Sequence, residues 1–197
     1  MLTHRSATLY NLFFTKETMK TFTIASILAL AAFAASATEI TVSGVRNSTG
    51  DNVTGSNIAL AQAVTPKLTA TAEFENTAGK TGTNADAYAI GARYTAYSSD
   101  KLTVTGVTKL GYADSLAGKG VYAQFGGEIA TPVTDSLTAS MGLNRQLGTS
   151  AVNAADRTEA TVGLRYAVAK NLAVKGSVAF YNDTPGNKAT LGLAYSF

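Results

Sequence analysis

The chain has 197 residues, with 16 Lys and Arg against 13 Asp and Glu, a single His and no Cys. Three of the basic residues and one acidic residue precede position 38, so the remainder is close to neutral and has no basic patch to favour nucleic acid. The lack of Cys excludes disulfides and thiolate metal sites. The one His, His4, lies at the N-terminal end, so no histidine base or zinc ligand remains beyond it. We therefore expect no cofactor, no metal and no enzymatic activity.

The first 37 residues carry the pattern of a secretory signal peptide behind a short extension. The pattern begins at Met19, continues through an apolar run over 22–34 and ends on Ala-Ser-Ala at 35–37. A signal peptidase recognises this ending, and the apolar run is shorter than the about 20 residues that a membrane-spanning helix needs. We expect residues 1–37 to be an N-terminal extension plus a cleaved signal peptide, and residues 38–197 to form a single domain.

From residue 38 onward, apolar and polar residues alternate with the period of a β-strand. Leu, Val, Ile and Phe take one set of positions, and Gly, Ser, Thr and charged residues take the other. Ten strands are predicted in chain order: 39–46, 57–65, 68–76, 86–97, 102–113, 121–131, 137–147, 157–168, 172–181 and 188–197. The first two are the least regular, which leaves eight strands as the alternative.

A repeat of 34 or 35 residues relates these strands. Short turns precede Leu68, Leu102, Leu137 and Leu172. Between them lie looser segments rich in Gly, Asn, Asp, Ser and Thr, residues that interrupt strands: 47–56, 77–85, 114–120, 148–156 and 182–187. Bacterial barrels distinguish their two ends by short turns and longer loops, and an even strand number brings both termini to the short-turn end.

A soluble β-sandwich would show the same alternation, with the apolar face as its core. A solvated outer face, however, normally carries about 25–35% charged residues. Here 15% of the chain is charged, and the polar face is rich in Gly, Ala, Ser and Thr. Small residues on the polar face favour a confined interior. The sequence therefore predicts an all-β fold, a ten-stranded antiparallel up-and-down transmembrane β-barrel.

The last predicted strand continues to the final residue of the chain. Leu191, Leu193, Tyr195 and Phe197 fall on one face, and small or polar residues fall on the other. This segment resembles the ends of bacterial outer-membrane β-barrel proteins, which commonly finish on an aromatic residue behind alternating apolar residues. The resemblance implies that these four residues form the signal read by the barrel-assembly machinery. It also implies a place in the outer membrane of a Gram-negative bacterium, in contact with lipid and lipopolysaccharide.

The polar face carries charges of both signs. By alternation, four acids and four bases point into the lumen: Glu73, Glu75, Arg93, Lys109, Glu128, Glu159, Arg165 and Lys175. One hypothesis is that they form salt bridges that fill the barrel without conduction. The other is a narrow polar pore whose charges set ion preference. A barrel of eight strands is about filled by its own side chains, and ten strands leave more room.

Two functions follow from these hypotheses. We expect a small porin-like channel for passive diffusion of ions or small polar solutes, since the resembling class includes many porin-like barrels. The alternative is a non-conducting structural or adhesive barrel whose external loops bind a surface partner. The two functions differ in whether the lumen is open.

Overall fold

The computed structural model describes residues 38–48, 53–78, 84–115, 118–148, 157–182 and 186–197. The expected N-terminal extension and signal peptide lie outside these residues, as do the central parts of the predicted longer loops. Within the described part of the chain, no helix is long and apolar enough to cross a membrane.

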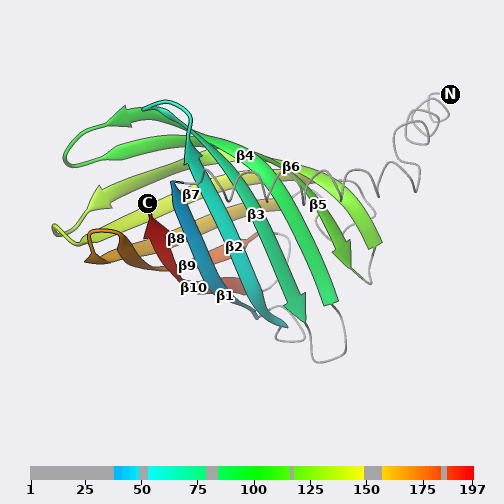
Figure 1. The fold of residues 1–197 in the computed structure, drawn as a ribbon. Coiled ribbons are helices and arrows are strands. Elements are labelled where there is room, and N and C mark those ends of the chain that lie inside the picture. Colours follow the sequence, from blue (N-terminus) through cyan, green and yellow to red (C-terminus); the bar gives the residue numbers. More distant parts are fainter. Residues whose placement is uncertain (1–37, 49–52, 79–83, 116–117, 149–156, 183–185) are drawn as a thin grey trace, which may run out of the picture.

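The strands form one closed antiparallel barrel (Figure 1). Each strand pairs with its neighbours in the chain, and β1 pairs with β10. The prediction of ten strands is confirmed, and the alternative of eight is wrong. The strands are β1 (Glu39–Asn47), β2 (Val53–Ala63), β3 (Leu68–Ala78), β4 (Asn84–Ser98), β5 (Thr103–Ser115), β6 (Gly118–Pro132), β7 (Leu137–Gly148), β8 (Arg157–Ala169), β9 (Leu172–Tyr181) and β10 (Asn187–Ser196).

The main difference from the predicted boundaries lies at the start of β2. The strand begins at Val53, whereas its loop-like composition predicted a start at residue 57. Thr54 pairs with Arg46 on β1 and with Ala78 on β3, so this stretch has a strand on each side. Backbone pairing with two neighbours outweighs the weak strand preference of Gly, Asn and Ser.

The two ends of the barrel differ, and we name them by their connections. At the turn end, the described chain makes four short connections, at 64–67, 99–102, 133–136 and 170–171. The start of β1 and the end of β10 also lie at this end. Three of these turns contain the same hydrogen bond, in which a side-chain hydroxyl accepts from the backbone N–H three residues later. Thr65, Ser99 and Thr134 accept in this way from Leu68, Leu102 and Leu137 at 3.0, 3.2 and 3.0 Å. The opposite end is called the loop end.

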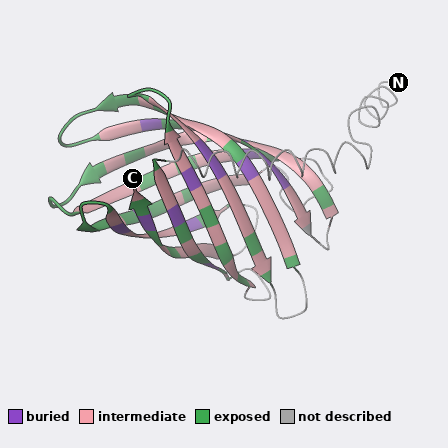
Figure 2. Ribbon diagram, in the orientation of Figure 1, coloured by how far each residue is buried: buried purple, intermediate pink, exposed green. Residues whose placement is uncertain are grey.

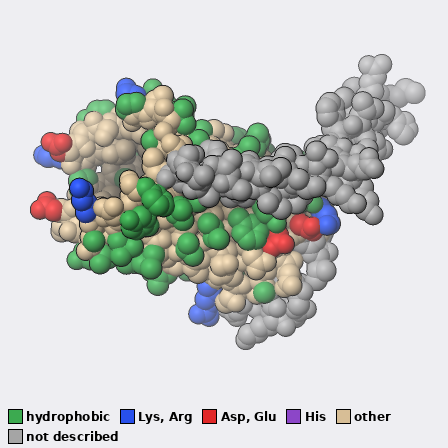
Figure 3. All heavy atoms as spheres, viewed as in Figure 1, with side chains coloured by type: hydrophobic (Ala, Val, Ile, Leu, Met, Phe, Trp, Pro, Cys, Tyr) green, Lys and Arg blue, Asp and Glu red, His purple; other side chains and the backbone are tan. Residues whose placement is uncertain are grey.

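Exposure alternates along much of the wall, most clearly on β2 and β10, as the banding in Figure 2 shows. Large apolar side chains occupy the exposed positions, so Phe125, Leu143 and Leu193 are 49%, 60% and 55% exposed. Of the large apolar side chains described, only Val45, Leu60 and Tyr112 are buried, so the apolar faces do not meet in a dry core as they would in a sandwich. Figure 3 shows hydrophobic side chains spread over the face of the barrel that is in view. An apolar exterior of this extent fits a wall that faces hydrocarbon.

Aromatic side chains mark both borders of this wall. Near the turn end, the outward residues include Tyr94, Tyr97, Tyr166, Tyr195 and Phe197, all of them exposed. Near the loop end, Phe74 of β3 and Tyr88 of β4 stack with ring centroids 4.9 Å apart. Aromatic girdles at both interfaces are a feature of transmembrane barrels, because these rings suit the boundary between hydrocarbon and water.

Two outward leucines of β7 lie at different depths in the proposed membrane and can test whether the wall faces hydrocarbon. Leu143 lies in the middle of the strand and Leu147 one residue before its end, and both point outward. We expect Leu143→Arg to lower the free energy of unfolding by about 2–4 kcal/mol and Leu147→Arg by about 0–1 kcal/mol, because the cost of a lipid-facing Arg falls toward the interface. Urea unfolding of the refolded barrel in phospholipid vesicles measures both values, and equal costs would contradict a membrane-spanning wall.

Candidate functional site

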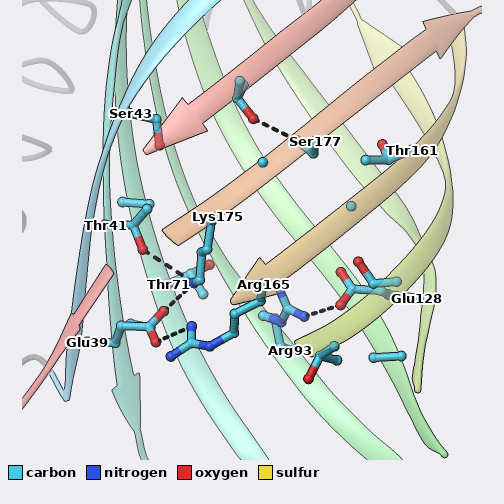
Figure 4. Close-up of a pocket in the computed structure, with 18 of the residues that line it drawn as sticks. Glu39, Thr41, Ser43, Thr71, Arg93, Glu128, Thr161, Arg165, Lys175 and Ser177 are labelled. Atoms are coloured by element: carbon cyan, nitrogen blue, oxygen red, sulfur yellow. Dashed lines mark hydrogen bonds and ion pairs between the residues drawn. The ribbon is translucent and has the colours of Figure 1, made fainter. Parts of the chain in front are cut away.

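The candidate site is the lumen of the barrel. A cavity of about 620 Å³ occupies its turn-end half and part of its middle (Figure 4). Its wall is composed mainly of Ser, Thr, Ala and Gly from β1–β3 and β6–β10, with one residue from β4. Six charged side chains also line it: Glu39, Glu73, Arg93, Glu128, Arg165 and Lys175. The cavity is therefore polar and carries both signs of charge.

Glu39, the first residue of β1, holds two cations at the turn end. Its Oε2 accepts a hydrogen bond from Arg165 Nη1 at 2.8 Å, and its Oε1 pairs with Lys175 Nζ. Arg165 of β8 and Lys175 of β9 are register partners, so their side chains emerge next to each other. One carboxylate thus separates two like charges that would otherwise repel each other in a partly dry interior.

A second ion pair lies on another part of the wall. Arg93 of β4 donates to Glu128 of β6 at 3.0 Å, passing over β5, and both side chains remain partly exposed to the cavity. Arg93 also interacts electrostatically with Lys175. Three cations thus line the turn-end part of the cavity, and each is paired with Glu39 or Glu128.

Further pairs lie deeper in the barrel. Lys109 of β5 donates to both carboxylate oxygens of Glu73 on β3, at 2.8 and 2.9 Å. Closer to the loop end, Lys188 of β10 pairs with Glu75 of β3. Because an unpaired charge in a partly desolvated interior is costly, these pairs allow a narrow barrel to hold many charges.

Large polar side chains point into the loop-end half of the lumen. We call the following set the loop-end layer: Glu75, Tyr122, Gln124, Gln146, Arg157, Glu159, Tyr181 and Lys188. Arg157 donates to Gln146 Oε1 at 3.2 Å and lies over the Tyr181 ring, 4.6 Å from its centroid. None of the eight lines the cavity. Small residues thus surround the cavity, whereas long polar residues make up the loop-end layer.

All eight charges named from the sequence lie at lumen-facing register positions. Five of them line the cavity, Lys109 pairs with one of those five, and Glu75 and Glu159 belong to the loop-end layer. The sequence interpretation missed three inward charges, Glu39, Arg157 and Lys188. Each stands at the first or second position of its strand, where alternation with Thr41, Glu159 and Thr190 would have placed it inward.

The inward glycines fall into two kinds: some allow neighbouring strands to approach closely, and others leave space in the lumen. A Cβ at Gly126 would collide with the backbone oxygen of Leu143, and one at Gly192 with the backbone oxygen of Val42. Neighbouring strands approach this closely on the inside of a tightly curved wall, where glycine allows the bend. Gly142, in contrast, faces only ordinary contacts, the nearest at 3.5 Å, so its site does leave space in the lumen.

The four C-terminal residues named as an assembly signal all face outward and are exposed. The N–H of Phe197 donates to the carbonyl oxygen of Thr38 at 3.1 Å, which extends the pairing of β10 with β1 to the last residue. Their role in assembly remains a prediction. Within the described ranges, no three His, Cys, Asp or Glu side chains gather where a metal ion could bind.

No protein-family model matches the chain, and no curated protein matches it in sequence. Among solved structures, the chain is similar to the KdgM porin in complex with disordered oligogalacturonate, with 14% identity, 81% of this chain and 99% of that chain covered, and a TM-score of 0.48. It is similar to the NanC porin, with 9% identity, coverage of 80% and 100%, and a TM-score of 0.47. It is also similar to the β domain of the Bordetella autotransporter BrkA, with 10% identity, coverage of 81% and 98%, and a TM-score of 0.49.

The carboxylate of Glu39, which pairs with both Arg165 and Lys175, is expected to contribute to the stability of the barrel. We expect Glu39→Gln to lower the free energy of unfolding by about 1–3 kcal/mol, because it leaves Arg165 and Lys175 adjacent without a counter-charge. Urea unfolding in detergent micelles measures the effect, and Asp135→Asn, in an exposed turn, is the matched control. Adding Arg165→Gln to Glu39→Gln should recover part of the loss. A double variant no more stable than Glu39→Gln would show that repulsion between the two cations is not the cause.

Proposed function

We propose that this protein is a porin-like channel of the bacterial outer membrane, through which ions or small polar solutes diffuse passively. The observation that carries the proposal is the charged, hydroxyl-lined cavity of about 620 Å³ inside a closed barrel with an apolar exterior. A lumen used only for packing would be filled along its whole length by its own side chains. Here, Ser, Thr and Gly keep half of it open.

The cavity charges support weak rather than strong ion selectivity. Three acids and three bases line the wall, so neither sign dominates. Arg93 and Arg165 each contact a carboxylate through one guanidinium nitrogen, and the rest of each group faces the cavity. Such groups exchange hydrogen bonds with passing water and ions without a fixed binding site. Rings of charged side chains set ion preference in this way in channels.

The placement in the outer membrane is part of the proposal. The aromatic borders and the apolar wall match a lipid environment, and the exposed C-terminal residues match the signal that the barrel-assembly machinery reads. At the loop end, Lys119 pairs with Asp114 at 2.6 Å on the outer side of the wall, where lipopolysaccharide phosphates would lie. One observation favours the second candidate, a non-conducting structural or adhesive barrel: long polar side chains joined by ion pairs and hydrogen bonds point into the loop-end half of the lumen. Discrete current steps in planar bilayers support the channel, and silent bilayers with a folded barrel support the second candidate.

Neutralising one member of a cavity ion pair tests the role of the charges. We expect Arg93→Gln to make the channel more cation-selective and Glu128→Gln to make it more anion-selective, because each change leaves the partner charge uncompensated. A unit charge about 4 Å away changes an ion's energy by about 1 kcal/mol in water, so a roughly two- to fivefold change in permeability ratio is expected. The reversal potential across a potassium chloride gradient measures this ratio.

Lys119→Gln is the control for this pair of variants, because Lys119 lies on the outer side of the wall and leaves the lumen unchanged. Its reversal potential should equal that of the unmodified protein. Shifts of the same sign for Arg93→Gln and Glu128→Gln would contradict ion passage through the cavity.

A further inference from the structure

The outer surface of the barrel carries its strand charges at one end. On the outward face of the described strands, every charged residue lies in the loop-end half: Arg46 on β1, Asp86 on β4, Asp114 on β5, Lys119 on β6 and Arg145 on β7. At the turn end, the described charges outside the lumen stand in the turns between strands. The two borders of the lipid-facing wall therefore differ in charge.

Arg145 is the outward charge that lies deepest in the wall. It stands three residues before Gly148, the last residue of β7, whereas the other four stand one or two residues from the loop-end limit of their strands. Its outward neighbours on β7 are Leu143 and Leu147, and its register partner on β6 is Phe125, all of them exposed. An Arg among lipid-facing apolar side chains is costly unless its charged group reaches the interface.

The guanidinium of Arg145 extends toward the loop end. Its Nη1 donates to Oγ1 of Thr158, the register partner of Arg145 on β8, at 3.2 Å. Thr158 is the second residue of β8 and therefore lies nearer the loop-end limit of its strand than Arg145 does. Long basic side chains at a membrane border extend in this way, with the stem along the apolar wall and the charge toward the headgroups.

Asn182 continues the same row beyond β9. It follows Tyr181, the last residue of that strand, and its Oδ1 accepts from the backbone N–H of Thr158 at 2.7 Å. With its oxygen used in this bond, Asn182 offers a ligand its NH2 group, and the Thr158 hydroxyl, which accepts from Arg145, still has a hydrogen to donate. A guanidinium, a hydroxyl and an amide thus form one row of donors on neighbouring strands.

This row suits an anion at the depth of a lipid headgroup. The two outward acids, Asp86 and Asp114, lie on β4 and β5, at least two strands away from Arg145, and Asp114 pairs with Lys119 at 2.6 Å. A guanidinium binds a phosphate group through two parallel hydrogen bonds. Because the row rises from the apolar wall to the end of the strands, a phosphate bound there has acyl chains of the same lipid beside the wall.

We propose that Arg145, Thr158 and Asn182 form a binding site for a phosphate of lipopolysaccharide. The longer loops of bacterial barrels face the outside, so the lipid at the loop end is the phosphorylated glycolipid of the outer leaflet. Arg145 pairs with the phosphate, and Thr158 and Asn182 donate to its other oxygens. The inference rests on the proposed placement in the outer membrane and is independent of conduction through the lumen.

The test measures how lipid A, the phosphorylated lipid part of lipopolysaccharide, binds to the refolded protein in dodecyl maltoside, a detergent without phosphate. Native mass spectrometry compares the unmodified protein with Arg145→Gln and Lys101→Gln. Lys101 lies in an exposed turn at the opposite end, so its variant is the control with the same change in charge. We expect Arg145→Gln to weaken binding about tenfold, because charge-assisted bidentate pairs are strong, and Lys101→Gln to leave it unchanged. Equal affinities of the two variants would overturn the site.

Varying the lipid tests which source supplies the phosphate. Lipid A stripped of its phosphates should bind to the unmodified protein as weakly as intact lipid A binds to Arg145→Gln. Phosphatidylglycerol and inorganic phosphate, each at the same concentration as lipid A, should not displace it. Displacement by phosphatidylglycerol would overturn the assignment to lipopolysaccharide, and displacement by inorganic phosphate would overturn a lipid site.

Thr158→Val is the second variant and serves if Arg145→Gln does not fold. Val suits a lipid-facing strand position and removes only the hydroxyl, so lipid A binding should weaken about threefold while heat-dependent gel mobility shows a folded barrel. Unchanged binding by folded Thr158→Val would remove Thr158 from the site.

Planar-bilayer conductance separates this inference from the channel. Arg145 lies on the outer side of the wall, so Arg145→Gln should conduct as the unmodified protein does. A conducting barrel that binds lipid A equally well with and without Arg145 overturns the lipid site and leaves the channel. A silent barrel whose lipid A binding requires Arg145 overturns the channel and leaves the lipid site.

Discussion

Backbone hydrogen bonding around a closed ring is the constraint on which the rest of this structure depends. Hydrocarbon offers no partner for an N–H or C=O group, so every strand in a membrane needs a strand on each side. Here β1 and β10 complete the ring over nine register pairs, from Glu39–Ser196 to Asn47–Lys188. The final residue is therefore held by the sheet, and an aromatic C-terminus is stable where a soluble chain would fray.

Closure also explains the chemistry of the interior. A strand in a closed wall has one face toward lipid and one toward the lumen, so every charge that cannot face lipid is confined inside. The narrow interior brings these charges close together, and opposite signs pair across intervening strands, as Arg93 and Glu128 do across β5. Tight curvature brings neighbouring backbones close on the inside, which requires glycine at Gly126 and Gly192. The pairing of charges and the inward glycines thus have one geometric cause.

The sequence predicted what depends on the period of a strand and missed what depends on the tilt and closure of the sheet. Strand number, the two faces and the inward direction of Glu73 or Arg165 all follow from alternation, because a side chain two residues on returns to the same face. The ion-pair partners do not follow from it. Lys188 and Glu75 are 113 residues apart and meet only because the ring closes between β10 and β1. Glu39, which holds two cations, stands at the first position of its strand, where alternation with Thr41 gave a signal that the sequence interpretation did not use.

Strand number alone does not decide whether such a barrel is open. The hypotheses of a filled lumen and of an open pore both assumed one character along the whole axis, whereas the inward residues differ between the two halves. Small residues surround the cavity of about 620 Å³, whereas the loop-end layer consists of long polar residues and two tyrosines. In a ring of fixed strand number, the radius of the backbone is the same throughout, so the free cross-section at each level is set by side-chain volume. The behaviour of the whole lumen therefore depends on the inward positions of its narrowest level, which strand number does not determine.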